Sequence, residues 1–182
     1  MNCIRRFCGH LNTINRHKWL VLKHCFKVGL YKQGLLHDLS KYAPQEFFVG
    51  VKYYQGNRSP NNAEREAVGY SSAWLRHKGR NKHHLEYWID YSLEPDKTMV
   101  GCEMPVKYVV EMFCDRVAAS KNYNKEKYRD SFPYDYYLNS KEHYLINEKT
   151  GELLSELLKM LSENGEEYTF RYIKKELLKN KE

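Results

Sequence analysis

The residues of this sequence with the clearest chemical potential are histidines and aspartates. Neutral imidazole combined with carboxylate is a donor set for Fe, Mn, Zn, Ni or Co. None of the five cysteines belongs to a C-x-x-C pair that would supply thiolate ligands instead. We therefore expect one or two divalent transition-metal ions as cofactors, held by ligands on different helices. In chain order the candidates are His17, His37, Asp38, His77, His83, His84 and Asp115.

Asp115 is informative because of its surroundings. It lies in a strongly apolar segment from residue 105 to residue 120, with Phe113 and Val117 close by. An unpaired carboxylate buried there would cost several kcal/mol, unless something cationic satisfies it. A metal ion would do so, and a carboxylate shared by two metals would explain why ligands recur on several helices.

The remaining histidines divide into alternatives and surface residues. His17 and His24 are seven positions apart on one edge of an apolar helix face, and only one of them is needed. We favour His17 and keep His24 as the alternative ligand. If His83 and His84 are helical, they point about 100° apart, so one would be the ligand and the other a donor behind it or a substrate contact. His10 and His143 are expected at the surface.

The elements that must position these residues are predicted to be helices. Apolar residues recur at helical spacing, and no stretch alternates for long as a β-strand does. The sequence predicts an all-α fold with a single domain over residues 1–182. Metal-site helices would occupy about 12–120, and a C-terminal helical extension about 121–182. The expected helices are 12–28, 35–41, 44–54, 61–79, 105–120, 151–162 and 166–179, with a turn-prone stretch at 123–144.

Positive charge is concentrated at the start of the chain. The net charge is +7, and the first 32 residues hold seven lysines or arginines and no acid. Such a segment could attract nucleic acid or a phosphorylated substrate, or be a solvated helix face. No apolar run of about 18 residues and no secretory signal is present. We expect a cytoplasmic protein that does not bind membranes.

The ligand order His17, His37-Asp38, His77, His83 or His84, Asp115 resembles the H…HD…H…H…D order of the HD-domain superfamily of metal-dependent phosphohydrolases. The strings at 37–42 (HDLSKY) and 81–88 (NKHHLEYW) also resemble an uncharacterised bacterial family that shares the HDLSKY block. The resemblance implies an HD-domain-like helical bundle. It assigns His17, His37, Asp38 and Asp115 to a first metal, with Asp38 bridging to a second metal held by His77 and by His83 or His84.

The activity implied by this resemblance is hydrolysis of a phosphoester or phosphoanhydride of a small anionic molecule, with a nucleotide as the expected class. Asp38 and Lys41 would be catalytic, because Lys41 stands where a lysine after the HD pair holds phosphate. Two alternatives use the same residues differently: an HD-like di-iron oxygenase, and a non-enzymatic module that binds metal or, less favoured, nucleic acid. A basic run lies beside these histidines and is expected to give further phosphate contacts, through Arg76, Arg80 and Lys82. The alternative interpretation of this run is a solvated helix end.

Overall fold

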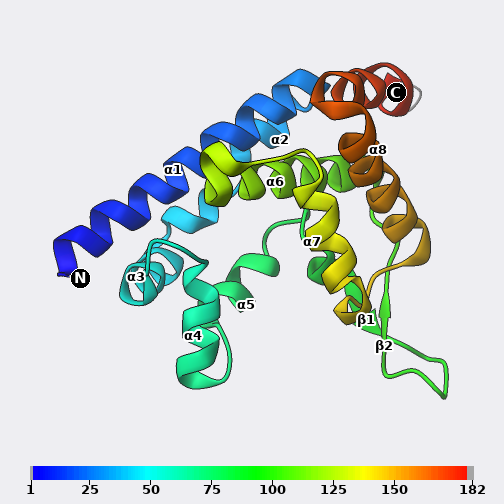
Figure 1. Ribbon diagram of the computed structural model, residues 1–182. Helices are drawn as coiled ribbons and strands as arrows, with labels where there is room; N and C mark the ends of the chain where they lie inside the picture. The colour runs from blue at the N-terminus through cyan, green and yellow to red at the C-terminus, as the bar shows by residue number, and fades with distance from the viewer. Residues whose placement is uncertain (1, 180–182) are drawn as a thin grey trace.

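In the computed structural model, which describes residues 2–179, helices form the architecture and two short strands form one hairpin (Figure 1). This confirms the all-α prediction. Residues 1 and 180–182 of the predicted domain lie outside the described range. The helices are α1 (Cys3–Val28), α2 (Tyr31–Leu36), α3 (Pro44–Tyr53), α4 (Pro60–Val68), α5 (Ser72–Lys78), α6 (Val106–Asn124), α7 (Phe132–Ser140) and α8 (Glu148–Tyr172). Shorter 3-10 turns cover Leu39–Tyr42, Leu85–Trp88, Lys125–Lys127 and Lys141–His143, and a π turn covers Ile173–Leu177.

Helix α1 starts earlier than predicted. The side chain of Asn2 accepts a hydrogen bond from the backbone N–H of Arg5 at 2.9 Å, which caps the helix nine residues before the expected start. The extra turns bury His10, whose ring lies 5.3 Å from Phe47 and 5.9 Å from Tyr54. The expectation of a surface position for His10 is therefore wrong. His143 is exposed, as expected.

Two predicted helices are broken where the sequence reads as continuous. The expected helix 35–41 does not form: α2 ends at Leu36, and Asp38 adopts a left-handed backbone with φ 55°. The expected helix 61–79 divides into α4 and α5 at Gly69, whose φ is 84°. A new N-cap follows, in which Ser71 accepts a hydrogen bond from the N–H of Trp74 at 3.1 Å. Both breaks change the direction of a segment that carries candidate ligands.

The region between α5 and α8 contains elements that the sequence did not predict. Strand β1 (Ile89–Tyr91) pairs antiparallel with β2 (Met99–Gly101), and Ile89 lies opposite Gly101. Helix α7 forms within the stretch expected to be turns. Helix α8 kinks at Gly165, with φ 77°, so it corresponds to the two predicted C-terminal helices.

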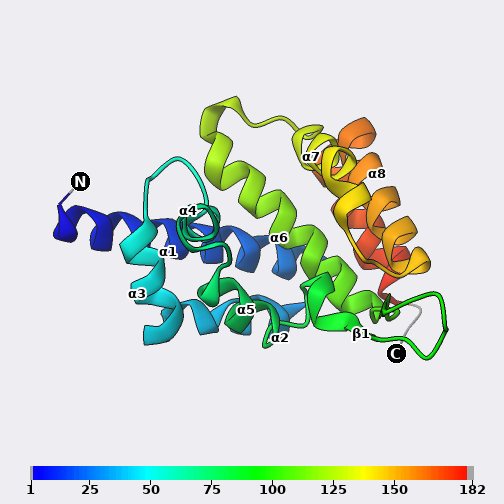
Figure 2. The same ribbon diagram turned by 90° about the horizontal axis from the view of Figure 1, so that it is seen from below.

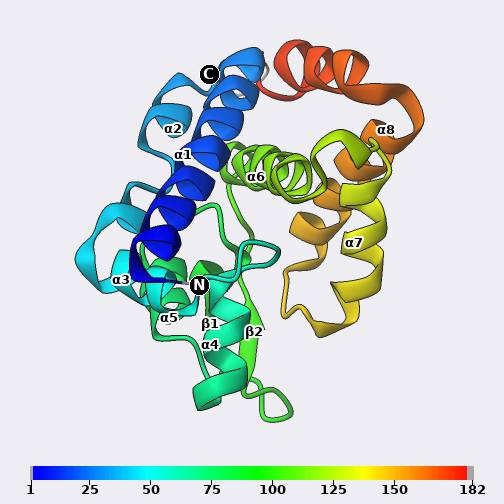
Figure 3. The same ribbon diagram turned by 60° about the vertical axis from the view of Figure 1, so that its left-hand side comes forward.

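Helix α6 is the central element. In Figure 2 it runs between α1 on one side and the pair α7 and α8 on the other, and Figure 3 shows the same order from a second direction. Side chains with no more than 1% exposure fill the space between α1, α6 and α8. They are Val21, Cys25, Val28, Val109, Val110, Phe113, Cys114, Val117, Ala118, Leu154, Leu157, Leu158 and Leu161. A smaller cluster of Ile14, Phe47 and Val51 joins α1 to α3. Helices α3, α4 and α5 gather below α1 in Figure 1.

Candidate metal centre

The predicted ligands converge from five parts of the chain. His17 comes from α1, the His37-Asp38 pair from the turn after α2, His77 from the last turn of α5, His83 and His84 from the loop after α5, and Asp115 from the middle of α6. Their donor atoms form two overlapping groups, each with all atoms within 4.8 Å of one another. The first group is His17, His37, Asp38 and Asp115, and the second is Asp38, His77, His83 and His84.

Asp38 lies at the centre and belongs to both groups. Its Oδ2 atom is 3.3 Å from Nε2 of His37 and 3.8 Å from Nε2 of His17. Its Oδ1 atom is 3.1 Å from Nε2 of His77 and 3.3 Å from Nε2 of His83. Each carboxylate oxygen therefore faces a different set of imidazoles, which is the arrangement that a carboxylate bridging two metals requires.

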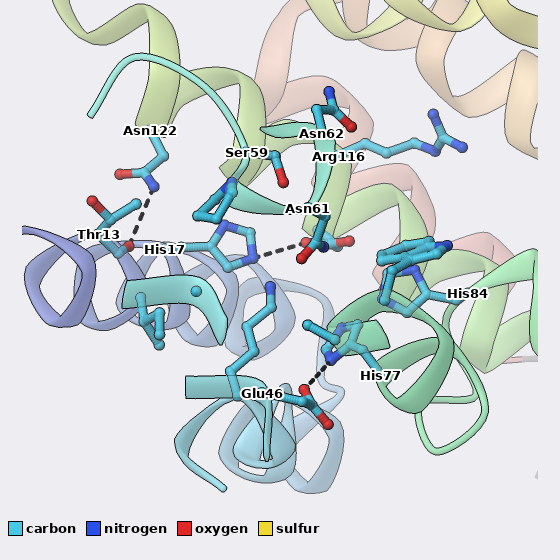
Figure 4. Close-up of a pocket in the computed structure, with 18 of the residues that line it drawn as sticks. Thr13, His17, Glu46, Ser59, Asn61, Asn62, His77, His84, Arg116 and Asn122 are labelled. Carbon is cyan, nitrogen blue, oxygen red and sulfur yellow. Dashed lines mark hydrogen bonds and ion pairs between the residues drawn. The ribbon is translucent and has the colours of Figure 1, made fainter. Parts of the chain in front are cut away.

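Asp115 completes the first group. Its Oδ1 atom lies 2.9 Å from Nε2 of His17, the contact dashed in Figure 4, and 3.7 Å from Nε2 of His37. Adjacent ligands bound at about 2.0–2.2 Å to one metal are separated by roughly 2.8–3.6 Å in octahedral or tetrahedral geometry. The separations around Asp38 and Asp115 are 2.9–3.8 Å, which spans this range and exceeds it only slightly.

The inward-facing atoms of the cluster are buried, and close to them lie other imidazoles and carboxylates of the cluster and Lys41, which pairs with Asp38. Within residues 2–179 none of them has a hydrogen-bond partner. Such buried, unsatisfied polar atoms are rare and call for an ion or ligand, because leaving them unpaired is unfavourable. The residues present therefore fit one or two divalent ions. The atoms in question are Nε2 of His17, His37, His77, His83 and His84, and both side-chain oxygens of Asp38.

Two glutamates hold the imidazoles from behind. Glu111 Oε1 lies 3.0 Å from Nδ1 of His37 and 3.1 Å from Nδ1 of His83, and Glu46 Oε2 lies 2.9 Å from Nδ1 of His77. A carboxylate on Nδ1 fixes the tautomer, so that Nε2 is free to bind a metal. Sequence reasoning missed both glutamates. Glu111 could have been found, because it is four residues before Asp115 and shares its face of α6. Glu46 carries no such signal.

The backbone around the His37-Asp38 pair is held by Lys18 of α1. Its Nζ donates hydrogen bonds to the carbonyl oxygens of Leu35, at 2.9 Å, and His37, at 2.8 Å. These bonds satisfy carbonyl groups left open where α2 ends. Lys18, one of the basic residues of the first segment, thus supports the left-handed turn that aims Asp38 into the cluster.

The charges of the cluster compensate one another. Burial opposes ionisation of Asp38, but His37 and Lys41 outweigh it and hold the pKa of this carboxyl well below its usual range. Burial likewise opposes protonation of His37, yet the carboxylates of Asp38 and Asp115 raise the pKa of His37 well above its usual value. Burial and the neighbouring His83 lower the pKa of His84. The site strongly favours positive charge close to Asp38.

A cavity of about 500 Å³ opens onto the cluster. His17, His77, His84 and Asp115 line it, and Figure 4 shows the labelled histidines turned toward the same space. Lys41 also lines the cavity, and its Nζ lies 2.5 Å from Asp38 Oδ2. A small molecule that enters this cavity reaches the metal-binding groups and the lysine together.

The other predicted phosphate contacts are not brought to this cavity. Arg76 instead pairs with Glu46 (Nε to Oε1, 3.5 Å), and Arg80 donates a weak hydrogen bond to the carbonyl oxygen of Arg76 at 3.4 Å. Lys82 lies over the rings of two tyrosines. The basic run therefore does not line this cavity, and the cations that do are Lys41, Arg65 and Arg116.

His24, the alternative ligand, is also placed elsewhere. Its ring lies 5.3 Å from Phe170, and its Nδ1 is 3.4 Å from the carbonyl oxygen of Cys114. It belongs to neither of the two groups around Asp38. The helix edge shared by His17 and His24 passes from the cluster into the apolar core, so the two residues face different surroundings.

The chain matches the model of a family of unknown function (DUF5662) over residues 7–160. It belongs to this family. The match covers every member of the cluster, as well as Glu46 and Glu111. No curated protein and no solved structure matches the chain. Among the described helices, none is both long and apolar enough to span a membrane.

Proposed function

We propose that this protein is a metal-dependent phosphohydrolase of the HD-domain type. Its substrate would be a phosphoester or phosphoanhydride of a small molecule, with a nucleotide as the expected class. The observation that carries the proposal is the position of Asp38, whose two oxygens face separate imidazole groups. Beside it is a cavity lined by His17, His77, His84, Asp115 and Lys41.

The roles follow from the contacts. One or two divalent ions at these groups would supply Lewis-acid activation of water and of the phosphoryl group. His17, His37, Asp38 and Asp115 would hold the first, and Asp38, His77 and His83, with His84 beside it, the second. Glu46 and Glu111 fix imidazole orientations from behind. Lys41 would offset negative charge on the phosphoryl oxygens in the substrate complex.

The test is a hydrolysis screen with nucleoside mono-, di- and triphosphates and p-nitrophenyl phosphate. We expect activity that chelation abolishes and that Mn, Fe, Co or Ni restores. Lys41→Met should retain the bound metal and lose about 100-fold in kcat, as expected for the loss of one electrostatic contact to a phosphoryl group. Lys82→Met, which alters a lysine away from the cavity, is the matched control. Inactivity of the metal-loaded protein on every compound contradicts the proposal.

The donor set also favours a second candidate, an HD-like di-iron oxygenase. Five histidines and only two aspartates meet here, and imidazole-rich sites suit iron as well as hydrolytic metals. Mössbauer and EPR spectroscopy of anaerobically purified protein separate the two functions. A coupled iron pair that reacts with oxygen indicates the oxygenase, whereas full activity with a redox-inactive metal indicates the hydrolase.

A non-enzymatic, nucleic-acid-binding role has less support, because several cations of the first segment are already engaged. Arg6 donates to the carbonyl oxygen of Lys52, Lys18 supports the His37 turn, and Lys27 pairs with Glu166 at 3.7 Å. Affinity for DNA or RNA that falls steeply with salt would revive this role.

A further inference from the structure

The cavity above the metal centre has a second positively charged wall, formed by Arg65 of α4 and Arg116 of α6. Within the described part of the chain, neither guanidinium forms an ion pair with a carboxylate. The arginines Arg58, Arg76 and Arg171, by contrast, each pair with a glutamate. Lys41, the remaining cation of the cavity, forms an ion pair with Asp38. The wall therefore carries positive charge that the protein itself does not compensate.

Aromatic rings hold both guanidinium groups in place without neutralising them. Arg116 lies over Tyr144 and Tyr137, at 5.3 and 5.7 Å from the ring centroids. Arg65 lies over Trp74 at 5.8 Å, and its Nη1 donates a hydrogen bond to Oδ1 of Asn62 at 2.9 Å. In the view of Figure 4, Arg116 and Asn62 are drawn on the side of the pocket away from Glu46. Stacking of this kind preserves the charge and orients the flat donor face of arginine.

Arg116 also has an unsatisfied donor. Its Nε is buried, and no group within residues 2–179 accepts a hydrogen bond from it. A buried guanidinium donor without an acceptor is unfavourable, and its fork geometry matches a phosphate or carboxylate group in a bidentate manner. An anionic ligand in the cavity would supply the missing acceptor.

We propose that Arg65 and Arg116 form an anion subsite separate from the metal centre, and that the substrate is a small molecule with two anionic groups. One phosphoryl group lies at the metal centre beside Lys41, and a second phosphoryl or carboxylate group lies against the arginines. The assignment of the first group rests on the proposed function; the arginine subsite does not. The cavity of about 500 Å³ is within the roughly 300–1,000 Å³ typical of small-molecule sites, far larger than a single phosphate group needs.

The test compares three ligands with one carbon skeleton: glucose 6-phosphate, glucose 1,6-bisphosphate and 6-phosphogluconate. Isothermal titration calorimetry measures their affinity for the full chain, with metal bound and after chelation. In the wild type we expect at least one of the two bis-anionic ligands to bind about tenfold or more tightly than glucose 6-phosphate, in keeping with a charged hydrogen bond. The preferred one identifies the second group as phosphoryl or carboxylate. Arg116→Gln and Arg65→Gln should each reduce this preference, and Arg171→Gln, which alters a paired arginine on α8, should not.

Equal affinity of the wild type for all three ligands overturns the subsite, and so does a preference that survives both cavity substitutions. Arg116→Lys, which keeps the charge but lacks the fork, should retain part of the preference and guards against an unfolded Arg116→Gln protein. Because binding needs no turnover, the affinities of the three ligands can still be compared if the hydrolysis screen finds no activity. Conversely, hydrolysis with no preference for a second anionic group would refute the subsite alone.

Discussion

Helix α6 borders two buried regions that differ in what stabilises them. On one side Phe113 and Val117 join α1 and α8 in an apolar core with almost no exposed surface. On the other side Glu111 and Asp115 face a cluster of buried imidazoles, and most of their inward nitrogens meet the carboxylates of Asp38 and Asp115 rather than apolar groups. Burial of apolar surface stabilises the first region directly, whereas burial of polar atoms makes the second unfavourable unless a ligand is bound. The comparison shows that the apolar core stabilises the fold and that the polar cluster stays buried because this core holds the helices in place.

The largest expected effect lies in the apolar core. Leu157→Ala removes a fully buried side chain of α8 and should lower the free energy of unfolding by about 2–5 kcal/mol. Denaturant unfolding of the chelated protein measures this loss. The gain in melting temperature on adding metal should remain as in the wild type. Leu93→Ala, at a residue with 90% exposure, is the control with little effect. A loss of the metal response in Leu157→Ala would show that the two regions are not separable.

Asp38→Asn tests the cluster: unlike Leu157→Ala, it should remove the stabilisation by metal. Asparagine tolerates the left-handed backbone of this position but cannot bridge two cations as a carboxylate does. Stabilisation by metal at 1,000 times its Kd is about 4 kcal/mol, and this increment should disappear. Thermal melts with and without metal measure it, with Asp96→Asn at an exposed position as the control. If Asp38→Asn still gains stability from stoichiometric metal as the wild type does, Asp38 is not a ligand.

His10 is a buried histidine that forms no ion pair with a carboxylate of residues 2–179, so it differs from the histidines of the cluster. Burial, and then repulsion by Lys41, lower the pKa of His10 from 6.5 to about 4. Between these pH values the unfolded chain binds a proton that the folded chain does not, so this residue reduces stability as pH falls from about 6.5 to 4. The reduction should reach about 2–3 kcal/mol at pH 4.

The measurement compares the unfolding free energy of chelated wild type and His10→Gln at pH 7 and pH 4.5. The variant should lose less stability on acidification than the wild type, and His143→Gln, at an exposed position, should lose as much as the wild type. Equal pH dependence of wild type and His10→Gln would mean that His10 titrates normally.

The smallest effect is expected for Glu111, which contacts the imidazole ligands from the side away from the proposed metal. Glu111→Gln leaves the fold and all donor atoms in place but weakens the hold on Nδ1 of His37 and His83. Metal affinity should fall about 10- to 100-fold, the usual cost of losing such a carboxylate. Competition with a chromophoric chelator measures it, with Glu152→Gln on the exposed side of α8 as control. Unchanged metal affinity in Glu111→Gln would show that Glu111 does not help to hold the imidazole ligands.

A site residue could be predicted from the sequence where its polarity conflicts with that of the residues around it. Asp115 conflicts with an apolar helix, and it lies in the cluster. Glu46 conflicts with nothing, because a glutamate in the first turn of a helix is ordinary whether it faces water or an imidazole. The same holds for Arg65 and Arg116, whose positions in the cavity follow only from how α4 and α6 are arranged.

The helices themselves were predictable where apolar residues repeat over several turns, as in α6 and α8. Short elements were not. Strands β1 and β2 contain three residues each, too few for an alternating pattern to emerge. The break after α2 depends on Asp38 in a conformation that non-glycine residues seldom adopt, stabilised by Lys18 from another helix.

The spread of the ligands from residue 17 to residue 115 has a consequence for the order of folding. These contacts have high contact order, so closing the loops between them is entropically demanding, and the apolar packing of α1 against α6 must largely precede it. The ion would then meet an almost complete pocket late in the process. Added metal should consequently slow unfolding far more than it accelerates folding, because it stabilises the native state and not the transition state.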